Sequence, residues 1–261
     1  MERENVEVKP SGAVAGDSRE RSEVDRLSLS AAGAPIGRSA ALRRSNLRRG
    51  MSNPFITEFG RKPLSPEEYE RFERYMGEIF YRMGMDLDSD GCRQTPHRWV
   101  QALVDMTDGY NGDPNIDVVF ERECVGCDEN NPTVQIVEGP ITFAALCEHH
   151  ALPFVGRAYI GCLRHQKIIG QSKFTRIVRK QSRQFTVQER IAQEIASELQ
   201  TLLDPHGVIV CLQAHHSCTQ CRGVREMGAS TRTIEKRGHY ASSSSAVSEF
   251  MALAGLDRPY S

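Results

Sequence analysis

The stretch CEHHALPFVG, residues 147–156, lies between two segments with the character of β-strands, and the interpretation of the chain turns on it. Before it, TVQIVEGPITF at 133–143 alternates apolar and polar residues, as a half-buried strand does. After it, VGRAYIGCL at 155–163 is a second strand, and GVIVCLQA at 207–214 is a third. The stretch is therefore predicted to lie at a strand end, where its Cys, Glu and two His could form a metal site, a proton relay or only a polar bend.

Two helices are predicted between the second and third strands. SKFTRIVRKQS at 172–182 has helical character, and VQERIAQEIASELQTLL at 187–203 places apolar residues on one helical face. Because helices and strands do not alternate regularly, the pattern favours an α+β fold with an antiparallel sheet over a doubly wound one. A last short helix is expected through Phe250 and Leu253.

Two further helices are predicted nearer the N-terminus. Ser65 has the properties of an N-cap, with Pro66 at the first helical position and Glu68 three residues after the cap. Gly84 is expected to end this helix. A second helix should begin at Thr95 and Pro96. We expect the apolar stripes of both helices to be core, including Trp99, Leu103 and Met106 of the second.

Residues 1 to about 60 differ from the rest of the chain. The part before Phe55 contains no aromatic residue and is rich in Ser, Ala, Gly and Arg. This composition predicts a disordered tail. A docking or regulatory arm is the alternative, using its basic cluster of Arg43, Arg44, Arg48 and Arg49.

The bulk composition excludes some classes of protein. The chain has 261 residues, 39% of them hydrophobic, and a formal net charge of −1, so no overall field attracts nucleic acid or an anionic membrane. No apolar run approaches the roughly 20 residues of a membrane span, and the start has no apolar signal segment. We therefore expect a cytoplasmic protein whose eight cysteines are mostly reduced.

Two clusters of Cys and His predict a metal site. Cys147 and His150 form a C-x-x-H pair, and HHSCTQCRGV at 215–224 lies just past the third strand. If both clusters meet at strand ends, Cys147, His150 and Cys218 supply the three protein ligands of a catalytic zinc, which leaves a fourth position for a water of pKa about 7. Cys221 leaves a four-ligand structural zinc open at this point.

The remaining histidines of the two clusters are candidates for proton transfer. His149 and His216 are adjacent to the predicted ligands, and an imidazole beside a metal-bound water can move protons at neutral pH. The alternative is that both are polar surface residues.

Cationic residues and one carboxylate are candidates for binding an anionic substrate. Ser172, Lys173 and Arg176 fall near a helix N-terminus, a position that favours anions. Arg98 and Arg222 are further cations, and Glu189 could accept two N–H donors from a guanine edge. For each of these residues the alternative is an ordinary solvated surface.

Taken together, these motifs resemble the GTP cyclohydrolase I family from about Ser65 to about Leu256. No one of them is specific alone, but the combination is. The resemblance is carried by TPHR at 95–98, CEHHALPFVG at 147–156, GQSKFTRIV at 170–178, VQER at 187–190 and H-x-C-x-x-x-RGV at 216–224.

The resemblance implies a fold, an assembly and a reaction. The fold would be the tunnelling fold, with N-terminal helices at about 64–112 followed by the sheet and helix pair at about 113–256. The assembly would be a toroidal homodecamer with sites between subunits. The reaction would convert GTP and water into formate and 7,8-dihydroneopterin triphosphate, the first step toward folate or other pterins.

The resemblance also implies roles for single residues. Cys147, His150 and Cys218 would be the zinc ligands. The family has no ligand equivalent to Cys221, which favours the open, catalytic zinc. The other positions divide into proton transfer (His149 and His216), guanine binding (Glu189 with Gln188 beside it), triphosphate binding (Lys173, Arg176, Arg222 and, from a neighbouring subunit, Arg98) and the neighbourhood of the ribose (Ser172).

Three features depart from the family pattern. Gln171 stands where the family usually has leucine, TRTI at 231–234 brings an unusual Arg232 and Ile234, and Cys124 and Cys127 form an additional C-x-x-C. These departures leave open a paralogue with another substrate, such as one of deazapurine metabolism. The fold is also compatible with its nitrile reductase branch and with a non-catalytic oligomeric binder.

Overall fold

The computed structural model describes residues 56–57, 60–121 and 134–257. A five-stranded sheet in the order β7-β4-β5-β8-β9 forms its centre. The long strands are β4 (Gln135–Cys147), β5 (Pro153–Leu163) and β8 (Gly207–His216), with β9 (Thr231–Gly238) at one edge and β7 (Phe185–Thr186) at the other. All neighbours in this sheet pair antiparallel except β4 and β7, which are parallel. The predicted α+β class with an antiparallel sheet is confirmed.

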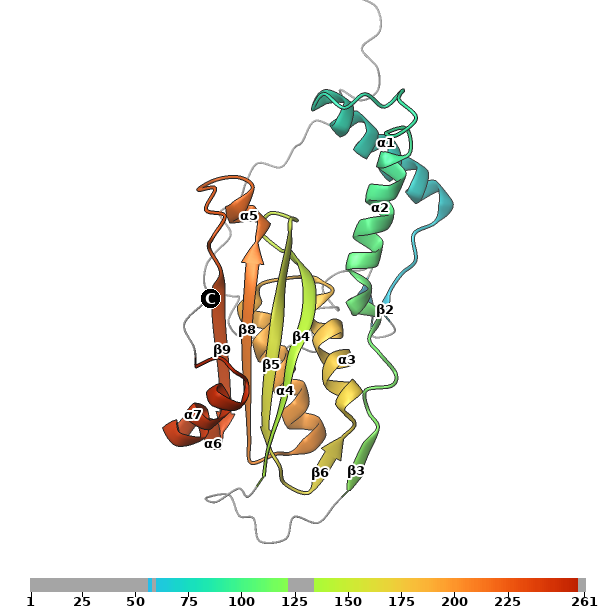
Figure 1. Cartoon of the computed structure of the whole chain (residues 1–261). Coiled ribbons are helices and arrows are strands. Elements are labelled where there is room, and N and C mark those ends of the chain that lie inside the picture. Colours follow the sequence, from blue (N-terminus) through green and yellow to red (C-terminus); the bar gives the residue numbers. More distant parts are fainter. Residues whose placement is uncertain (1–55, 58–59, 122–133, 258–261) are drawn as a thin grey trace, which may run out of the picture. The chain divides into compact units, whose positions relative to one another are not determined.

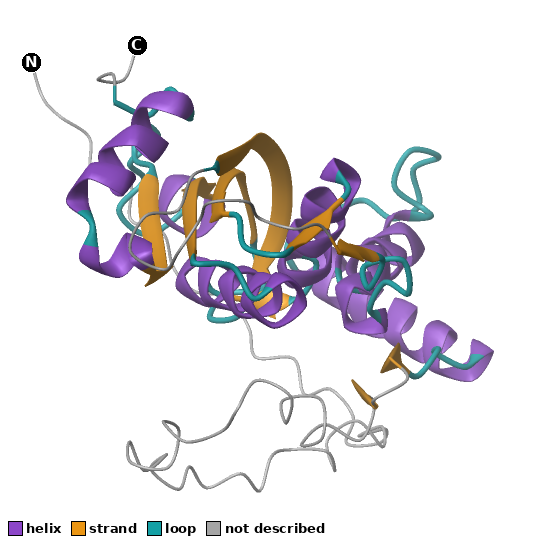
Figure 2. Cartoon of the chain, turned by 90° about the horizontal axis from the view of Figure 1, so that it is seen from below, coloured by secondary structure: helices purple, strands orange, loops and turns teal. Residues whose placement is uncertain are grey.

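Two helices cover one face of the sheet (Figures 1 and 2). They are α3 (Gln171–Ser182) and α4 (Gln188–Leu203), which pack against each other and against β4, β8 and β9. The buried faces of these helices meet every second residue of the central strands, such as Val208, Val210 and Leu212 of β8. Alternation along the strands thus supplies the larger core, as the apolar pattern of the sequence requires.

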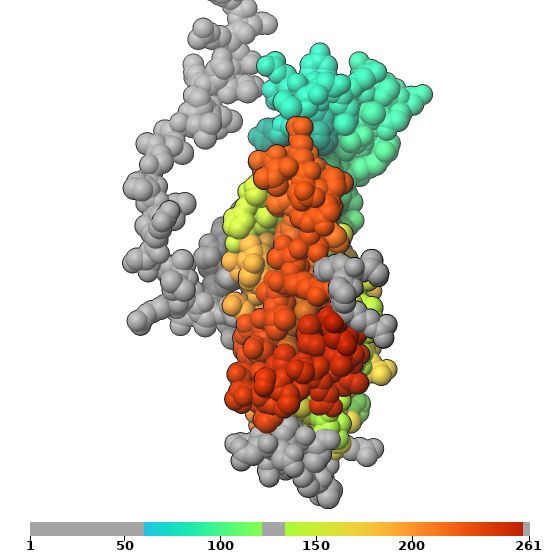
Figure 3. Space-filling model, turned by 60° about the vertical axis from the view of Figure 1, so that its left-hand side comes forward, coloured from blue at the N-terminus to red at the C-terminus, as the bar shows by residue number. Residues whose placement is uncertain are grey.

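The intervening residues of the central strands face the opposite side of the sheet. There Tyr159, Ile209 and Cys211 pack with Tyr240 and Phe250 in a second, smaller core. The covering elements are α6 (His239–Ser242) and α7 (Ser244–Leu253), which contact β8, β9 and β4. The elements from β8 to α7 occupy the orange and red surface in Figure 3. The short helix predicted through Phe250 and Leu253 is confirmed as α7.

The remaining elements are short, apart from the two N-terminal helices. They are β1 (Ile56–Thr57), β2 (Gly60–Arg61), α1 (Pro66–Arg82), α2 (Thr95–Met106), η5 (Asp108–Asn111), β3 (Val119–Glu121), β6 (Lys167–Ile169) and α5 (Ser217–Gln220). β1 pairs with β2, and β3 pairs with β6, both antiparallel. None of the described helices has the length and apolarity needed to cross a membrane. Apart from β1 and part of β2, the tail predicted over residues 1–60 lies outside the described residues.

The prediction that the apolar stripes of α1 and α2 are core is wrong for most of their residues. α1 has no buried residue, and Trp99 of α2 is 39% exposed. Leu103 and Met106 are only partly buried. The physical reason is that these two helices mainly cover each other, with Phe80 and Trp99 in an edge-to-face contact at 6.0 Å between ring centroids, and one neighbouring helix cannot enclose a whole apolar stripe.

Candidate metal centre and substrate site

The turn between β4 and β5 places two of the predicted ligands side by side. The amide of Cys147 donates to the carbonyl oxygen of Leu152 at 2.9 Å, and the amide of Ala151 donates to the carbonyl oxygen of Cys147 at 2.8 Å. Ala151 takes a positive φ of 54° to close this turn. As a result, Nδ1 of His150 lies 3.6 Å from Sγ of Cys147.

The third predicted ligand, Cys218, lies just after the end of β8. This strand pairs with β5 so that His216 lies opposite Phe154, close to the turn that carries Cys147. α5 begins directly after His216, and Cys218 on it is buried, with 8% of its surface exposed. The ligand atoms of Cys147, His150 and Cys218 all lie within 4.8 Å of one another. The structure therefore brings the two Cys/His clusters together as predicted.

The three residues fit a zinc ion. Two thiolates and one imidazole belong to the ligand types that zinc takes in proteins. With bonds of about 2.3 Å to sulfur and 2.0 Å to nitrogen, a tetrahedral ion separates its S and N ligands by about 3.5 Å. The 3.6 Å between Cys147 and His150 matches this edge. Cys221 is exposed and is not in the converging group, so the structure favours three protein ligands over four.

The electrostatics of the thiols also favour a cation here. Burial raises the pKa of the Cys218 thiol, and the neighbouring Cys147 raises it further. Two adjacent buried thiolates repel each other unless a positive charge lies between them. A bound metal ion supplies that charge and keeps both thiols deprotonated.

The two candidate proton-transfer histidines lie at the same end of the sheet. Nδ1 of His149 is 4.0 Å from Sγ of Cys147, and the His149 side chain is exposed. His216 is half-buried and stacks on Phe154, with the ring centroids 4.5 Å apart and an angle of 9° between the planes. Burial lowers the pKa of His216, whereas the charge of Glu189 acts in the opposite direction.

The first turn of α4 carries the predicted guanine-binding pair, but its two residues are placed differently. Glu189 is exposed and within electrostatic reach of His216. Gln188 is 1% exposed, and its side chain is hydrogen-bonded to His216, Leu212 and Thr231. The neighbouring Arg190 donates to the Glu148 carboxylate, which ties α4 to the turn that carries the metal ligands.

The cations of α3 lie apart from the metal ligands. Arg176 donates to the Asp113 carboxylate at 2.8 Å, and Lys173 donates to the carbonyl oxygen of Asn115. Because α3 starts just after β6, Ser172 and Lys173 lie near the opposite end of the sheet from Cys147. Among the cations predicted to bind triphosphate, Arg222 lies near the predicted metal ligands of its own chain, because its charge acts on Cys218. Arg98 is exposed on the first turn of α2.

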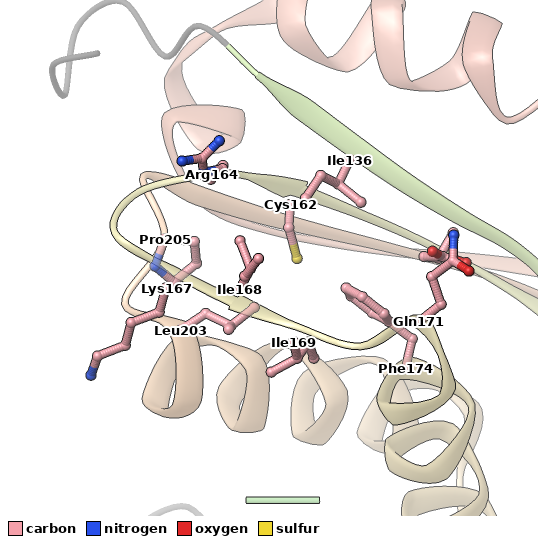
Figure 4. Close-up of a pocket in the computed structure, with 11 residues that line it drawn as sticks. Ile136, Cys162, Arg164, Lys167, Ile168, Ile169, Gln171, Phe174, Leu203 and Pro205 are labelled. Atoms are coloured by element: carbon pink, nitrogen blue, oxygen red, sulfur yellow. The ribbon is translucent and has the colours of Figure 1, made fainter. Parts of the chain in front are cut away.

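A cavity of about 210 Å³ lies near the start of α3 (Figure 4). Its apolar wall includes Ile169 and Phe174, and Arg164 and Lys167 contribute polar groups. Gln171, the residue that departs from the family pattern, also lines this cavity. The departure therefore affects the end of the sheet that carries Ser172 and Lys173, and not the end that carries the metal ligands.

The other departures are placed as follows. Arg232 and Ile234 lie on the edge strand β9, opposite Gln213 and Cys211 of β8, and both are exposed. Cys124 and Cys127 lie outside the described residues. The structure thus leaves the additional C-x-x-C as a prediction.

Fold and site together define an α+β protein in which two cysteines and one histidine, at the end of an antiparallel sheet, form a group that could hold a metal ion. Comparison with known proteins identifies the family. The family model of GTP cyclohydrolase I matches residues 72–255. The chain belongs to the GTP cyclohydrolase I family.

Relatives from distant organisms carry the same name. The GTP cyclohydrolase 1 of Deinococcus radiodurans is 36% identical over 187 residues, which cover 72% of this chain and 84% of that protein. Those of a Synechococcus species and of Saccharomyces cerevisiae are each 34% identical and cover 80% of this chain, with 90% and 85% of their own lengths. A crystal structure of the archaeosine synthase QueF-Like in the apo form aligns with a TM-score of 0.33 at 10% identity, covering 40% of this chain and 92% of that chain.

Proposed function

We propose that the protein is a zinc-dependent GTP cyclohydrolase with the tunnelling fold. It would convert GTP and water into formate and 7,8-dihydroneopterin triphosphate, which feeds folate or other pterin synthesis. The observation that carries the proposal is the convergence of Cys147, His150 and Cys218 in a family whose relatives are named for this activity.

Cys147, His150 and Cys218 would hold the zinc ion. When bound there with one open position, zinc supplies a water molecule acidified toward neutral pH for attack on the substrate. The two cysteines must stay reduced to bind it, which fits a reducing compartment such as the cytoplasm.

The residues around the metal ligands would bind the base and move protons. The exposed carboxylate of Glu189 accepts two N–H donors from guanine, and such a donor pair is absent from adenine. His149 and His216 supply and remove protons as the imidazole ring of the purine opens and formate leaves. Both histidines lie at the metal end of the sheet, so one bound base can reach them.

The positions of the cations support a site shared between subunits of a homo-oligomer. Lys173 precedes Ser182, the last residue of α3, by nine residues, roughly 14 Å along the helix axis. Gln184, two residues further on, accepts a hydrogen bond from the amide of Leu146, beside Cys147. A triphosphate that contacts Lys173 and Arg176 of the same chain would be drawn away from the metal ligands. We propose that a neighbouring subunit supplies Lys173 and Arg176, another supplies Arg98, and the subunits form a homodecamer.

Purified protein incubated with GTP tests the proposal. Formate is measured enzymatically, and the pterin product is measured as fluorescent neopterin after oxidation and dephosphorylation. We expect equal amounts of both products, and none of either from enzyme stripped of metal. Release of formate without a pterin, or no reaction of zinc-loaded enzyme with GTP, would refute the proposed function.

A further inference from the structure

The buried amide of Gln188 connects α4 with β8, β9 and the side chain of His216. Gln188 is the first residue of α4, and only 1% of its surface is exposed. Its Nε2 lies 3.1 Å from the carbonyl oxygen of Leu212 on β8 and 3.0 Å from that of Thr231 at the start of β9. Its Oε1 lies 3.0 Å from Nε2 of His216.

These contacts determine which way the amide points. A carbonyl oxygen can only accept hydrogen bonds, so the two carbonyls of Leu212 and Thr231 need the NH₂ group of Gln188. The amide oxygen must then face His216. Because that oxygen is an acceptor, the hydrogen atom between the two side chains belongs to Nε2 of His216.

Neighbouring residues restrict the orientation of the His216 ring. Phe154 stacks on it in nearly parallel orientation, and the strand register places the two residues opposite each other. The hydroxyl of Thr219 donates to the His216 carbonyl oxygen at 2.9 Å, which holds the backbone at the start of α5. The ring plane and the position of Nε2 are therefore fixed from two sides.

We infer that Gln188 is a positioning residue that keeps neutral His216 protonated on Nε2, so that His216 accepts protons from the substrate only through Nδ1. The identity of the substrate rests on the proposed function, whereas the hydrogen bond between Gln188 and His216 does not depend on it. It gives Gln188 a role other than binding guanine, since its amide groups are engaged within the protein.

Steady-state kinetics distinguish positioning from guanine binding. In Gln188→Met the side chain keeps its length and loses its hydrogen bonds to His216, Leu212 and Thr231. Loss of an orienting partner typically lowers activity about 10- to 100-fold, and here we expect the loss in kcat with KM for GTP little changed. Gln193→Met makes the same chemical change at an exposed position of the same helix and should retain full activity. A raised KM with unchanged kcat in Gln188→Met would overturn the inference.

Nitrogen NMR tests the tautomer directly in the wild-type enzyme and does not depend on how Gln188→Met folds. Solid-state spectra of the zinc-loaded wild-type enzyme, labelled with ¹³C,¹⁵N-histidine, are recorded at pH about 8.5, where an imidazole of ordinary pKa about 6.5 is neutral. His216 is assigned by the loss of its signals in His216→Asn. We expect the protonated nitrogen to correlate with Cδ2, as Nε2 must. A protonated nitrogen that correlates with Cγ, or an average of both forms, would overturn the inference.

The two experiments separate the inference from the proposed function. If zinc-loaded enzyme shows the Nε2–H tautomer and does not turn over GTP, the Gln188–His216 arrangement stands and the GTP cyclohydrolase proposal fails. If the enzyme turns over GTP and His216 carries its proton on Nδ1, the proposed function stands and the role of Gln188 fails.

Discussion

A site shared between subunits should be restored when two inactive variants, each changed in a different part of the site, assemble together. One variant, Cys218→Ser, loses a metal ligand. The other, Lys173→Ala with Arg176→Ala, loses the cations at the start of α3. Each charge-assisted contact is worth roughly 1.5–3 kcal/mol, so removing two should lower kcat/KM by about 10²- to 10⁴-fold. Each variant alone should therefore be nearly inactive.

The expected recovery follows from the geometry. Suppose that Cys147, His150 and Cys218 of a site come from one chain and that Lys173 and Arg176 come from its neighbour. A site is then intact only when the first chain carries the Lys173→Ala and Arg176→Ala changes and the neighbour carries Cys218→Ser. With random assembly at equal amounts, each condition holds for one half of the subunits. About one quarter of the sites should then be intact, and no site would be intact if every chain formed its own site.

The assay uses co-expression with two different affinity tags, followed by purification on both tags, so that only mixed oligomers are measured. Formate release per subunit should reach about one quarter of the wild-type rate. Mixing Cys218→Ser with Cys147→Ser is the matched control, because both changes remove a predicted metal ligand and no intact site can form. Mixed oligomers that are no more active than their parents would refute the shared site.

Three further outcomes are expected. Cys218→Ser should lose bound zinc, measured by mass spectrometry, together with formate release, while Cys221→Ser keeps both; full activity without metal would contradict the ligand assignment. Glu189→Gln turns one acceptor into a donor and should lower kcat/KM for GTP about 10- to 100-fold, and an unchanged value would exclude its role in guanine binding. The hydrogen bond from Arg176 lowers the pKa of Asp113, so the stabilisation is present above the unfolded pKa of about 3.9 and is lost as pH falls through the lower folded value. Asp113→Asn should therefore reduce the free energy of unfolding at pH 7 by less than about 1 kcal/mol, and calorimetry should show no difference at a pH below both pKa values.

Features that depend on neighbouring residues in the sequence could be predicted well. The capping box of α1 forms as expected, with the amide of Ser65 donating to the Glu68 carboxylate at 2.9 Å and the Glu68 amide donating to the Ser65 hydroxyl at 3.2 Å. The three central strands are also predicted, the first from its apolar alternation and the other two from short apolar runs. Both signals arise within a few residues and need no knowledge of the tertiary structure.

The edge strand β9 was not predicted, because its stability comes from elsewhere. Its sequence, TRTIEKRG, has a single large aliphatic residue, Ile234, and that residue is exposed. Edge strands with charged residues carry little apolar periodicity. What orders this segment is pairing with β8 along its whole length, from Gly207 opposite Gly238 to Ala214 opposite Thr231.

The candidate metal site likewise depends partly on nearby residues in the sequence and partly on contacts between distant ones. The C-x-x-H spacing predicts that Cys147 and His150 share a turn, and the structure confirms it. Spacing alone cannot show that Cys218, about seventy residues later, reaches them. The register of β5 against β8 settles that point, because it sets His216 opposite Phe154 at the end of the sheet where Cys147 lies.

The burial of Gln188 could be predicted from the helical periodicity of the sequence, although the VQER motif does not show it. Within VQER, the glutamine and the glutamate are adjacent, which suggests a common role. Yet Gln188 precedes the buried Ile191, Ala192 and Ile195 by three, four and seven residues, so the period of the helix assigns it to the buried face of α4. Glu189 falls about 100° away and is exposed. A buried amide must find partners inside the protein, and those within its reach are two strand carbonyls and His216. Helical periodicity alone therefore separates Glu189, whose side chain is free to meet a ligand, from Gln188, whose side chain can orient His216.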